Sequence, residues 1–155
     1  MNISWSKFEV QAPEIAKAGK RLLVGKDGVS IGYLATSSYE VPKISPVCPV
    51  FSGDGIYLVV SKSTPKYRDL TINLNYSLHA FLGKSDEEFK ITGKAFLLED
   101  EATRISVQKD IPFGSFDEND PIFELYLDNA LWAVWKDVGT ENTNVARKYW
   151  RKQHG

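Results

Sequence analysis

The stretch from Lys43 to Leu70 constrains the fold more than any other part of the chain. Ile56–Val60 is a continuous apolar and aromatic run, which is typical of a strand covered on both faces. Gly53-Asp54-Gly55, directly before it, supplies the residues that reverse a chain in a tight turn. The sequence therefore predicts a strand, a tight turn and a buried strand in this order.

Two prolines, Pro46 and Pro49, interrupt the segment Lys43–Phe51 that precedes the turn. A proline has no backbone N–H to donate to a neighbouring strand. We therefore predict that this strand lies at a sheet edge or is irregular. An irregular strand leaves backbone groups available to a ligand, which makes this segment a candidate cofactor site.

A polar corner follows the buried strand. Thr64 is a residue type that caps helices, and Pro65 suits the first helical position because its missing N–H would be unpaired there anyway. The amides of Lys66 and Tyr67 are then predicted to be free, at the positive end of the helix dipole. Two lysines and two hydroxyl residues surround them: Lys62, Ser63, Thr64 and Lys66. The corner is predicted to bind an anion, with phosphate favoured; the alternative is that the lysines are only solvated.

Hydrophobic periodicity predicts the remaining elements. Helices are expected over Pro13–Leu23, from Asp100 to about Lys109, and over Asn142–Lys152. Strands are expected over Ile31–Ser37, Tyr76–Leu82, Phe89–Leu98 and Ile122–Trp135, the last either as one long strand or as two strands joined by a bulge near Asp128-Asn129. In Phe89–Leu98, the side chains of Phe89, Ile91, Ala95 and Leu97 should share one face, and Gly93 suggests a bend or a close approach.

The balance of many short strands with few helices predicts an antiparallel barrel with helices at its rim, in the mainly β or α+β class. A chain of 155 residues suits a single domain, 1–155, with a genuine core. A net charge of −1 gives no support for binding to nucleic acid or a membrane surface. With one cysteine, no signal peptide and no membrane-spanning stretch, we expect a cytoplasmic protein.

The sequence offers little protein-based catalysis. It has no G-x-G-x-x-G after a strand, no Walker loop, no G-x-S-x-G and no paired cysteines, and its two histidines, His79 and His154, lie far apart. Dinucleotide-fold, triphosphate, hydrolase and metal chemistry are therefore unsupported, and no metal site is expected.

The ordered motifs P-K-I-S-P-V-x-P-V-F, D-G-x-Y-L, S-T-P-K-x-x-D-L, N-x-x-Y-S-L-H-A-F and D-E-E-F-x-I-T-G-K-A run from about Leu34 to Asp100. This set resembles the FMN-binding split-barrel proteins, the pyridoxamine 5'-phosphate oxidase-like family, and most nearly its small uncharacterised branch. The resemblance implies an antiparallel six-stranded Greek-key split barrel with short flanking helices. It also implies a homodimer with FMN at the interface.

The resemblance further assigns residues to the flavin. The phosphate would be held by Lys43, Ser63, Thr64 and Lys66; Lys43 replaces the family's usual arginine and gives a point charge instead of a bidentate fork. Five residues would line the ring and the ribityl chain: Ile44, Ser45, Val47, Val60 and Ser61. In the family the second subunit brings a C-terminal tryptophan or arginine to the flavin, a role that falls on Trp132 and Arg151. The alternative is that the tail tryptophans are core or interface aromatics.

Two functional classes follow. The first is an FMN-dependent oxidoreductase acting on an unidentified small molecule or electron donor. The second is a non-catalytic protein that holds flavin, deazaflavin or haem for storage, sensing or stress protection, and a third option is a barrel that binds a protein partner. Efficient pyridoxamine 5'-phosphate oxidase activity is not expected, because the tail Arg147–Lys152 lacks the arginine-x-histidine-x-arginine-like segment of true oxidases.

Overall fold

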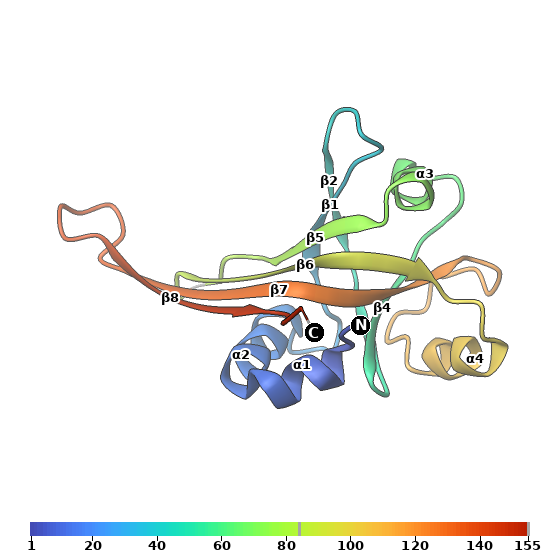
Figure 1. The fold of residues 1–155 in the computed structure, drawn as a ribbon, viewed down its shortest axis with the longest axis horizontal. Helices are drawn as coiled ribbons and strands as arrows, with labels where there is room; N and C mark the ends of the chain where they lie inside the picture. The colour runs from blue at the N-terminus through green and yellow to red at the C-terminus, as the bar shows by residue number, and fades with distance from the viewer. Residues whose placement is uncertain (84, 155) are drawn as a thin grey trace.

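The strands form one curled antiparallel sheet in the computed structural model, which describes residues 1–83 and 85–154 (Figure 1). The strands of this sheet are β1 (Gly32–Thr36), β2 (Lys43–Val47), β3 (Val50–Ser52), β4 (Gly55–Val59), β5 (Asn75–Ala80), β6 (Glu87–Leu97), β7 (Ile122–Lys136) and β8 (Asn144–Arg151). The helices of the described part are α1 (Trp5–Gln11), α2 (Pro13–Leu23), α3 (Pro65–Ile72) and α4 (Glu101–Lys109). None of these helices is long and apolar enough to cross a membrane.

The strand order is β2-β1-β5-β6-β7-β4-β3. β8 pairs with β7 on the side away from β6, further along β7 than the residues that pair with β4. This curled antiparallel sheet with short helices confirms the predicted split-barrel class. It has eight strands instead of six. The difference arises because the segment Lys43–Phe51 forms two strands and because the tail adds β8.

The proline-interrupted segment behaves as its sequence predicts. Its first half is β2 and its second half is β3, and the chain leaves the sheet at Cys48-Pro49 between them. β2 and β3 lie at opposite ends of the strand order, so both halves are edge strands. Pro49 thus falls where the chain crosses from one edge of the curled sheet to the other, where no ladder hydrogen bond is needed.

The predicted bulge is present where β6 and β7 pair. Gly93 is opposite Leu127 while Thr92 is opposite Asn129, so Asp128 is one extra residue on β7. A Cβ atom on Gly93 would lie 1.9 Å from the carbonyl oxygen of Tyr126. The close approach expected from this glycine is confirmed, and only glycine fits it without moving the backbone of β7.

The tail corrects one prediction. Asn142–Lys152 is not a helix; it forms β8, which pairs with β7 from Asn144 opposite Lys136 to Arg151 opposite Asn129. The reversal lies between the two strands, where Asp137 and Gly139 adopt positive φ angles. Eight cross-strand pairs with a long partner outweigh the weak helical pattern of the tail. Figure 1 shows this β7–β8 hairpin extending well beyond the helices.

The main core lies between one face of the sheet and the helices α1 and α2 (Figure 1). Phe8 of α1 and Ile15 of α2 pack there against Phe89, Ile91 and other buried strand residues. α2 has the predicted bounds, whereas α1 was not predicted. A smaller cluster lies under α4, whose N-cap is Asp100 as expected. Leu97 is 46% exposed, against expectation, because it lies beyond the end of the core at the last residue of β6.

Candidate functional site

A polar hollow of about 470 Å³ lies between the loop that joins β1 to β2 and the start of α3. Both elements lie on the same side of the sheet in Figure 1. The hollow is lined by Ser38, Glu40, Lys43, Lys62, Ser63, Thr64, Pro65, Arg68 and Asp69. We call it the α3 hollow. It contains the corner that the sequence singled out, and it joins this corner to the edge strand β2.

The start of α3 has the predicted bounds but different hydrogen bonds. Pro65 is the first helical residue after Thr64, yet the Thr64 side chain makes no capping hydrogen bond. Its hydroxyl donates instead to the carbonyl oxygen of Ser61, at 2.7 Å. Contrary to the prediction, the amide of Tyr67 is not free, because it donates to the carbonyl oxygen of Thr64 at 3.2 Å. The helix therefore begins without a side-chain cap, which leaves its positive end available to an anion.

Two hydroxyl groups stand side by side before the helix. The side-chain oxygens of Ser61 and Ser63 are 3.0 Å apart, and the amide of Ser63 donates to the Ser61 hydroxyl at 3.4 Å. One of the two hydroxyl hydrogens is used in the hydrogen bond between the groups, so the pair has one hydroxyl hydrogen left to donate to an anion. Ser63, which lines the hollow, and its neighbour Ser61 thus provide a donor beside the lysines.

Lys43 reaches the hollow from β2 and forms an ion pair with Asp69. Its ammonium nitrogen lies 3.0 Å and 3.2 Å from the two carboxylate oxygens of Asp69, and the Thr36 hydroxyl donates to one of them at 2.8 Å. Asp69 is only 1% exposed. Burial raises the pKa of Asp69, but the hydrogen bonds from Lys43 and Thr36 outweigh it and hold the pKa below its ordinary value. The pair ties β2 to α3 and fixes the position of Lys43.

The charge of the hollow is positive on balance. Lys43, Lys62 and Arg68 face two carboxylates, Glu40 and Asp69, and Asp69 is neutralised by Lys43. Lys62 and Arg68 are both exposed. Their charges remain for a ligand, since neither forms an ion pair with another described residue.

Arg68 is a site residue that the sequence analysis missed. It lies four residues after Thr64, so one helical turn brings it to the same face of α3. That spacing is the signal that identifies it in the sequence. Lys66, which the resemblance assigned to the phosphate, is half-buried in the first turn of α3 and is not part of the lining of the hollow.

The residues assigned to the flavin ring and the ribityl chain lie on β2 and directly after β4, and none of them lines the hollow. Ser45 is opposite Leu34, on the face of β2 that also carries Lys43 and Val47, whereas Ile44 points to the other face and is 71% exposed. Val60 is buried in the core, and its amide donates to the carbonyl oxygen of Pro121 at 2.9 Å. The side chain of Val60 is therefore a packing residue.

Trp132 and Arg151 point to opposite faces of the β7–β8 hairpin. The indole N–H of Trp132 donates to Glu87 at 2.9 Å, and the Lys148 ammonium lies 5.5 Å from its ring. Arg151 is opposite Asn129 and donates to its side-chain oxygen at 3.0 Å. Within one chain the hairpin is separated from β2 by β1, β5 and β6, so neither residue reaches the α3 hollow of its own subunit.

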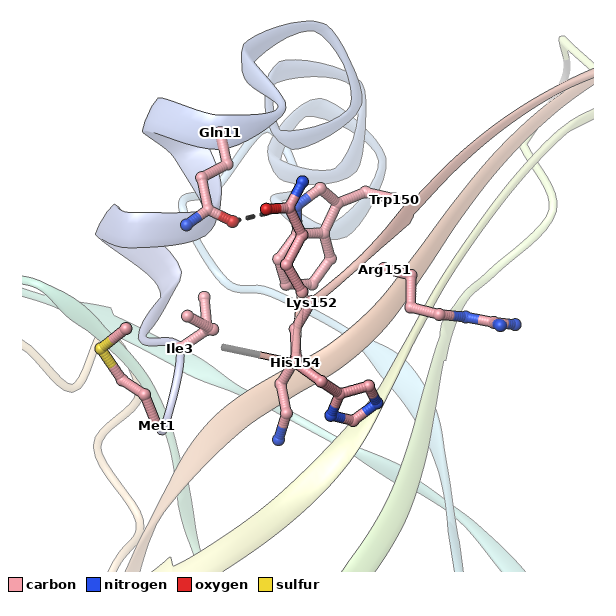
Figure 2. A pocket seen from close by; sticks show the side chains of 8 residues that line it. Met1, Ile3, Gln11, Trp150, Arg151, Lys152 and His154 are labelled. Atoms are coloured by element: carbon pink, nitrogen blue, oxygen red, sulfur yellow. Dashed lines mark hydrogen bonds between the residues drawn. The ribbon is translucent and has the colours of Figure 1, made fainter.

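A larger hollow, about 710 Å³, lies where the first and last described residues meet (Figure 2). The indole N–H of Trp150 donates there to the Gln11 side chain at 3.1 Å, and Figure 2 shows Arg151 extending away from this pair. The Lys152 ammonium is held by Asp128 at 2.5 Å. This hollow lacks the hydroxyl pair and helix start of the α3 hollow. No group of three or more potential metal-binding side chains was found among the described residues.

The Lys43–Asp69 pair gives a prediction about pH. Because the folded-state pKa of Asp69 is lowered, its ionised form stabilises the fold above its unfolded pKa of about 3.9, and this contribution disappears as the pH falls through the lower folded-state value. We expect Asp69→Asn to reduce the free energy of unfolding by about 1.5–3 kcal/mol at pH 7 and by less at pH 3, with the difference shrinking further as the pH falls. Urea denaturation at both pH values measures this difference. Asp54→Asn, in an exposed turn, should change stability little at either pH. An equal loss for Asp69→Asn at both pH values would show that the ionised pair is not its cause.

Comparison with known proteins supports the fold assignment. No protein-family model matches the sequence, and no curated protein matches it. A Clostridium acetobutylicum protein related to general stress protein 26, of the pyridoxinephosphate oxidase family, superposes with a TM-score of 0.59 at 14% identity, covering 94% of this chain and 95% of that one. A Listeria innocua protein described as a candidate pyridoxamine 5'-phosphate oxidase gives 0.56 at 16% identity, covering 79% of this chain and 95% of that one.

A haem-binding protein from Mycobacterium smegmatis also superposes, with a TM-score of 0.56 at 18% identity. The match covers 83% of this chain but only 57% of the haem-binding protein. These similarities show that the chain has the split-barrel fold of pyridoxamine 5'-phosphate oxidase-like proteins. At such low sequence identities these similarities show the fold alone, and the function has to be argued from the site.

Proposed function

We propose that this chain binds FMN, with the flavin phosphate in the α3 hollow, and acts as an FMN-dependent oxidoreductase on a small molecule. The observation that carries the proposal is the donor set of the hollow: Lys62, Arg68 and the Ser63 hydroxyl beside an uncapped helix start. Charged donors and a hydroxyl group at the positive end of a helix together suit a phosphate dianion. The resemblance in sequence, which covers the same corner, favours FMN among phosphate-bearing ligands.

The chain's own residues have limited tasks in this proposal. Lys62 and Arg68 neutralise the phosphate, and Ser63 orients it by hydrogen bonding. The ion pair with Asp69 holds Lys43 at the rim, so Lys43 contributes charge at a fixed place. When bound, FMN supplies the electron transfer, because its ring accepts and releases electrons without an acid–base cluster from the protein.

The alternative is a non-catalytic protein that holds flavin, deazaflavin or haem. The haem-binding structural neighbour gives this alternative its motive. Haem iron takes axial ligands such as histidine, cysteine, methionine or tyrosine. The described lining of the α3 hollow contains none of these residue types, so the hollow favours a phosphate-bearing flavin over haem.

The absorption spectrum of the purified protein distinguishes these cofactors. We expect flavin bands, either at once or after incubation with FMN and removal of the excess. Bleaching of those bands by a reductant and their return on addition of candidate electron acceptors would favour turnover over storage. A Soret band would select haem, a deazaflavin spectrum would replace FMN, and a protein that stays colourless after incubation with FMN would contradict flavin binding.

We further propose that the chain is a homodimer. The sheet face opposite α1 and α2 carries apolar side chains next to the edge strand β2: the rings of Tyr33 and Phe81 stack with centroids 4.3 Å apart, and Ile44 is 71% exposed. A stable interface typically buries more than about 1,200 Å² in total, and in this proposal the face and the unpaired edge of β2 together form that interface.

Light scattering at micromolar concentration tests this proposal. We expect a dimer for the wild type and a monomer for Ile44→Glu, because a charge buried at an apolar interface is not compensated. Val10→Glu is the matched control, since Val10 is 83% exposed on α1, on the other face. A wild-type monomer under these conditions would rule out a flavin site shared between two subunits.

A further inference from the structure

Three neighbouring strands present two rows of side chains on the sheet face opposite α1 and α2. The first row is Thr92 on β6, Asn129 on β7 and Arg151 on β8, which are directly opposite one another. The second row, one step along the strands, is Lys90, Leu131 and Tyr149. A hollow of about 360 Å³ lies over these two rows. We call it the bulge hollow.

The bulge at Asp128 creates this arrangement. Without the extra residue, strand alternation would place Asn129 and Leu131 on the same face as Leu127, toward the helices. With it, the alternation shifts by one residue, so Asn129 and Leu131 share the face of Thr92 and Lys90. Bulges commonly re-aim side chains near functional sites, and this one assembles a polar row on a sheet face.

The polar row is held by its own hydrogen bonds. The Asn129 amide nitrogen donates to the Thr92 hydroxyl oxygen at 3.1 Å, and the Asn129 oxygen accepts from the Nε of Arg151 at 3.0 Å. Asn129 thereby fixes both neighbours. The Thr92 hydroxyl hydrogen and the two terminal nitrogens of Arg151 are left to donate to a ligand. Figure 2 shows the guanidinium group of Arg151 extended away from Trp150 and Gln11, although Arg151 is also among the residues that line the 710 Å³ hollow drawn there.

The bulge hollow is a set of donors around an apolar floor. Lys90 adds a second positive charge, and no described carboxylate lines the hollow. The side chain of Leu131 forms its floor, and the ring of Tyr149 forms one wall; the side chain of Ala130 points to the opposite face of β7, into the core. Its volume lies at the lower end of the range of small-molecule sites, about 300–1,000 Å³. Two cations and a hydroxyl donor favour an anion, and the planar fork of Arg151 matches a carboxylate.

We propose that the bulge hollow is a second binding site, for a small aromatic carboxylate. The carboxylate binds Arg151, Lys90 and Thr92, and the ring lies over Leu131 against Tyr149. The site is separated from the α3 hollow of the same chain by β1 and β5 and shares no residue with it. The inference therefore does not depend on the proposed FMN binding.

Benzoate is a suitable probe, followed by amide NMR shifts of the protein as purified and again after saturation with FMN. We expect saturable shifts at residues 90–92, 129–131 and 149–151, with a Kd of about 1 mM. Arg151→Gln should weaken binding about tenfold or more, because it removes a charge-assisted hydrogen bond. Lys90→Gln, at a half-buried position, should weaken it in the same direction and guards against a folding defect in the first variant.

Arg147→Gln is the matched control, since Arg147 lies on the same strand and face but over the Trp135 ring, 5.6 Å from its centroid. It should bind benzoate as the wild type does.

Benzamide keeps the ring and loses the charge, so it should bind at least about tenfold more weakly than benzoate. Inorganic phosphate, which lacks the ring, should also bind at least about tenfold more weakly. Equal binding of benzamide or of phosphate, or the absence of shifts at these residues, overturns the proposal. The proposal is also overturned if FMN displaces benzoate and if Arg151→Gln weakens FMN binding, because Arg151 would then be part of the flavin site. Benzoate binding to a protein that never binds FMN would support this site and reject the proposed function.

Discussion

Replacing Gly93 by alanine is expected to lower the free energy of unfolding by at least about 3 kcal/mol. The added Cβ would lie 1.9 Å from the carbonyl oxygen of Tyr126 and 3.0 Å from the Cα of Leu127. These are backbone atoms of β7, which is paired with β6 on one side; on the other side the Leu127 amide donates to the carbonyl oxygen of Ile3 at 2.9 Å, between the segments of β7 that pair with β4 and β8. A side chain can rotate away from a clash, but a strand bonded on both sides cannot shift without breaking its ladders.

Urea denaturation of Gly93→Ala beside Gly114→Ala measures this effect. Gly114 lies in a loop where an added Cβ would meet no atom within 4 Å, so its replacement should change stability by no more than about 0.5 kcal/mol. The two substitutions add the same methyl group and differ only in surroundings. Equal stability of the two variants would mean that the bulge at Asp128 does not bring the strands as close as the structure has them.

Local signals explain which elements the sequence predicts well. The helix Pro13–Leu23 has an apolar stripe and a proline at its start, and the structure gives it the same bounds. Asp100 accepts a hydrogen bond from the amide of Thr103, as its capping role requires. Gly93 stands out because a glycine on the apolar face of a strand typically marks a bend or the close approach of another backbone. Each of these signals acts within a few residues.

Elements that depend on distant partners were not predictable in the same way. β8 is defined by its pairing with β7, and its own sequence, from Asn144 to Arg151, has no clear alternation of apolar and polar residues. The helix Trp5–Gln11 is stabilised by burial of Trp5 and Phe8 against Phe51 and Phe89, which are far along the chain. Tertiary packing decides both cases, and a single sequence does not display it.

In the candidate site too, residues close together in the sequence were predictable, whereas contacts between distant segments were not. Ser63 and Thr64 belong to a contiguous corner with a recognisable helix start, and the structure places both at the α3 hollow. Asp69 is the partner of Lys43, 26 residues earlier, so the pair becomes visible only when β2 and α3 meet. Ser38 and Glu40 join the hollow from the loop between β1 and β2 for the same reason. The sequence therefore indicated the anion-binding corner at Ser63 and Thr64, and only the folded structure shows that Ser38, Glu40 and Lys43 line the other side of the hollow.

The second large effect concerns the phosphate of FMN. Lys62→Gln combined with Arg68→Gln should weaken FMN binding by at least about a hundredfold, since each substitution removes a charge-assisted hydrogen bond. Both residues are exposed, so the fold should tolerate the change. Lys26→Gln combined with Arg147→Gln removes the same number of positive charges away from the hollow, and this variant should bind FMN as the wild type does.

Lys66→Gln separates two assignments of the phosphate site. A large loss of FMN affinity would favour the residues assigned by the sequence resemblance, and a small loss would favour the residues that line the hollow.

Comparing the affinity for FMN with the affinity for riboflavin tests the central claim most directly, because the two ligands differ only in the phosphate. Titration followed by flavin fluorescence gives both constants for the same protein. We expect the wild type to bind FMN at least about a hundredfold more tightly than riboflavin, and the Lys62→Gln, Arg68→Gln variant to bind both within about threefold of each other. Equal affinities of the wild type for FMN and riboflavin would contradict the assignment of the α3 hollow to the phosphate.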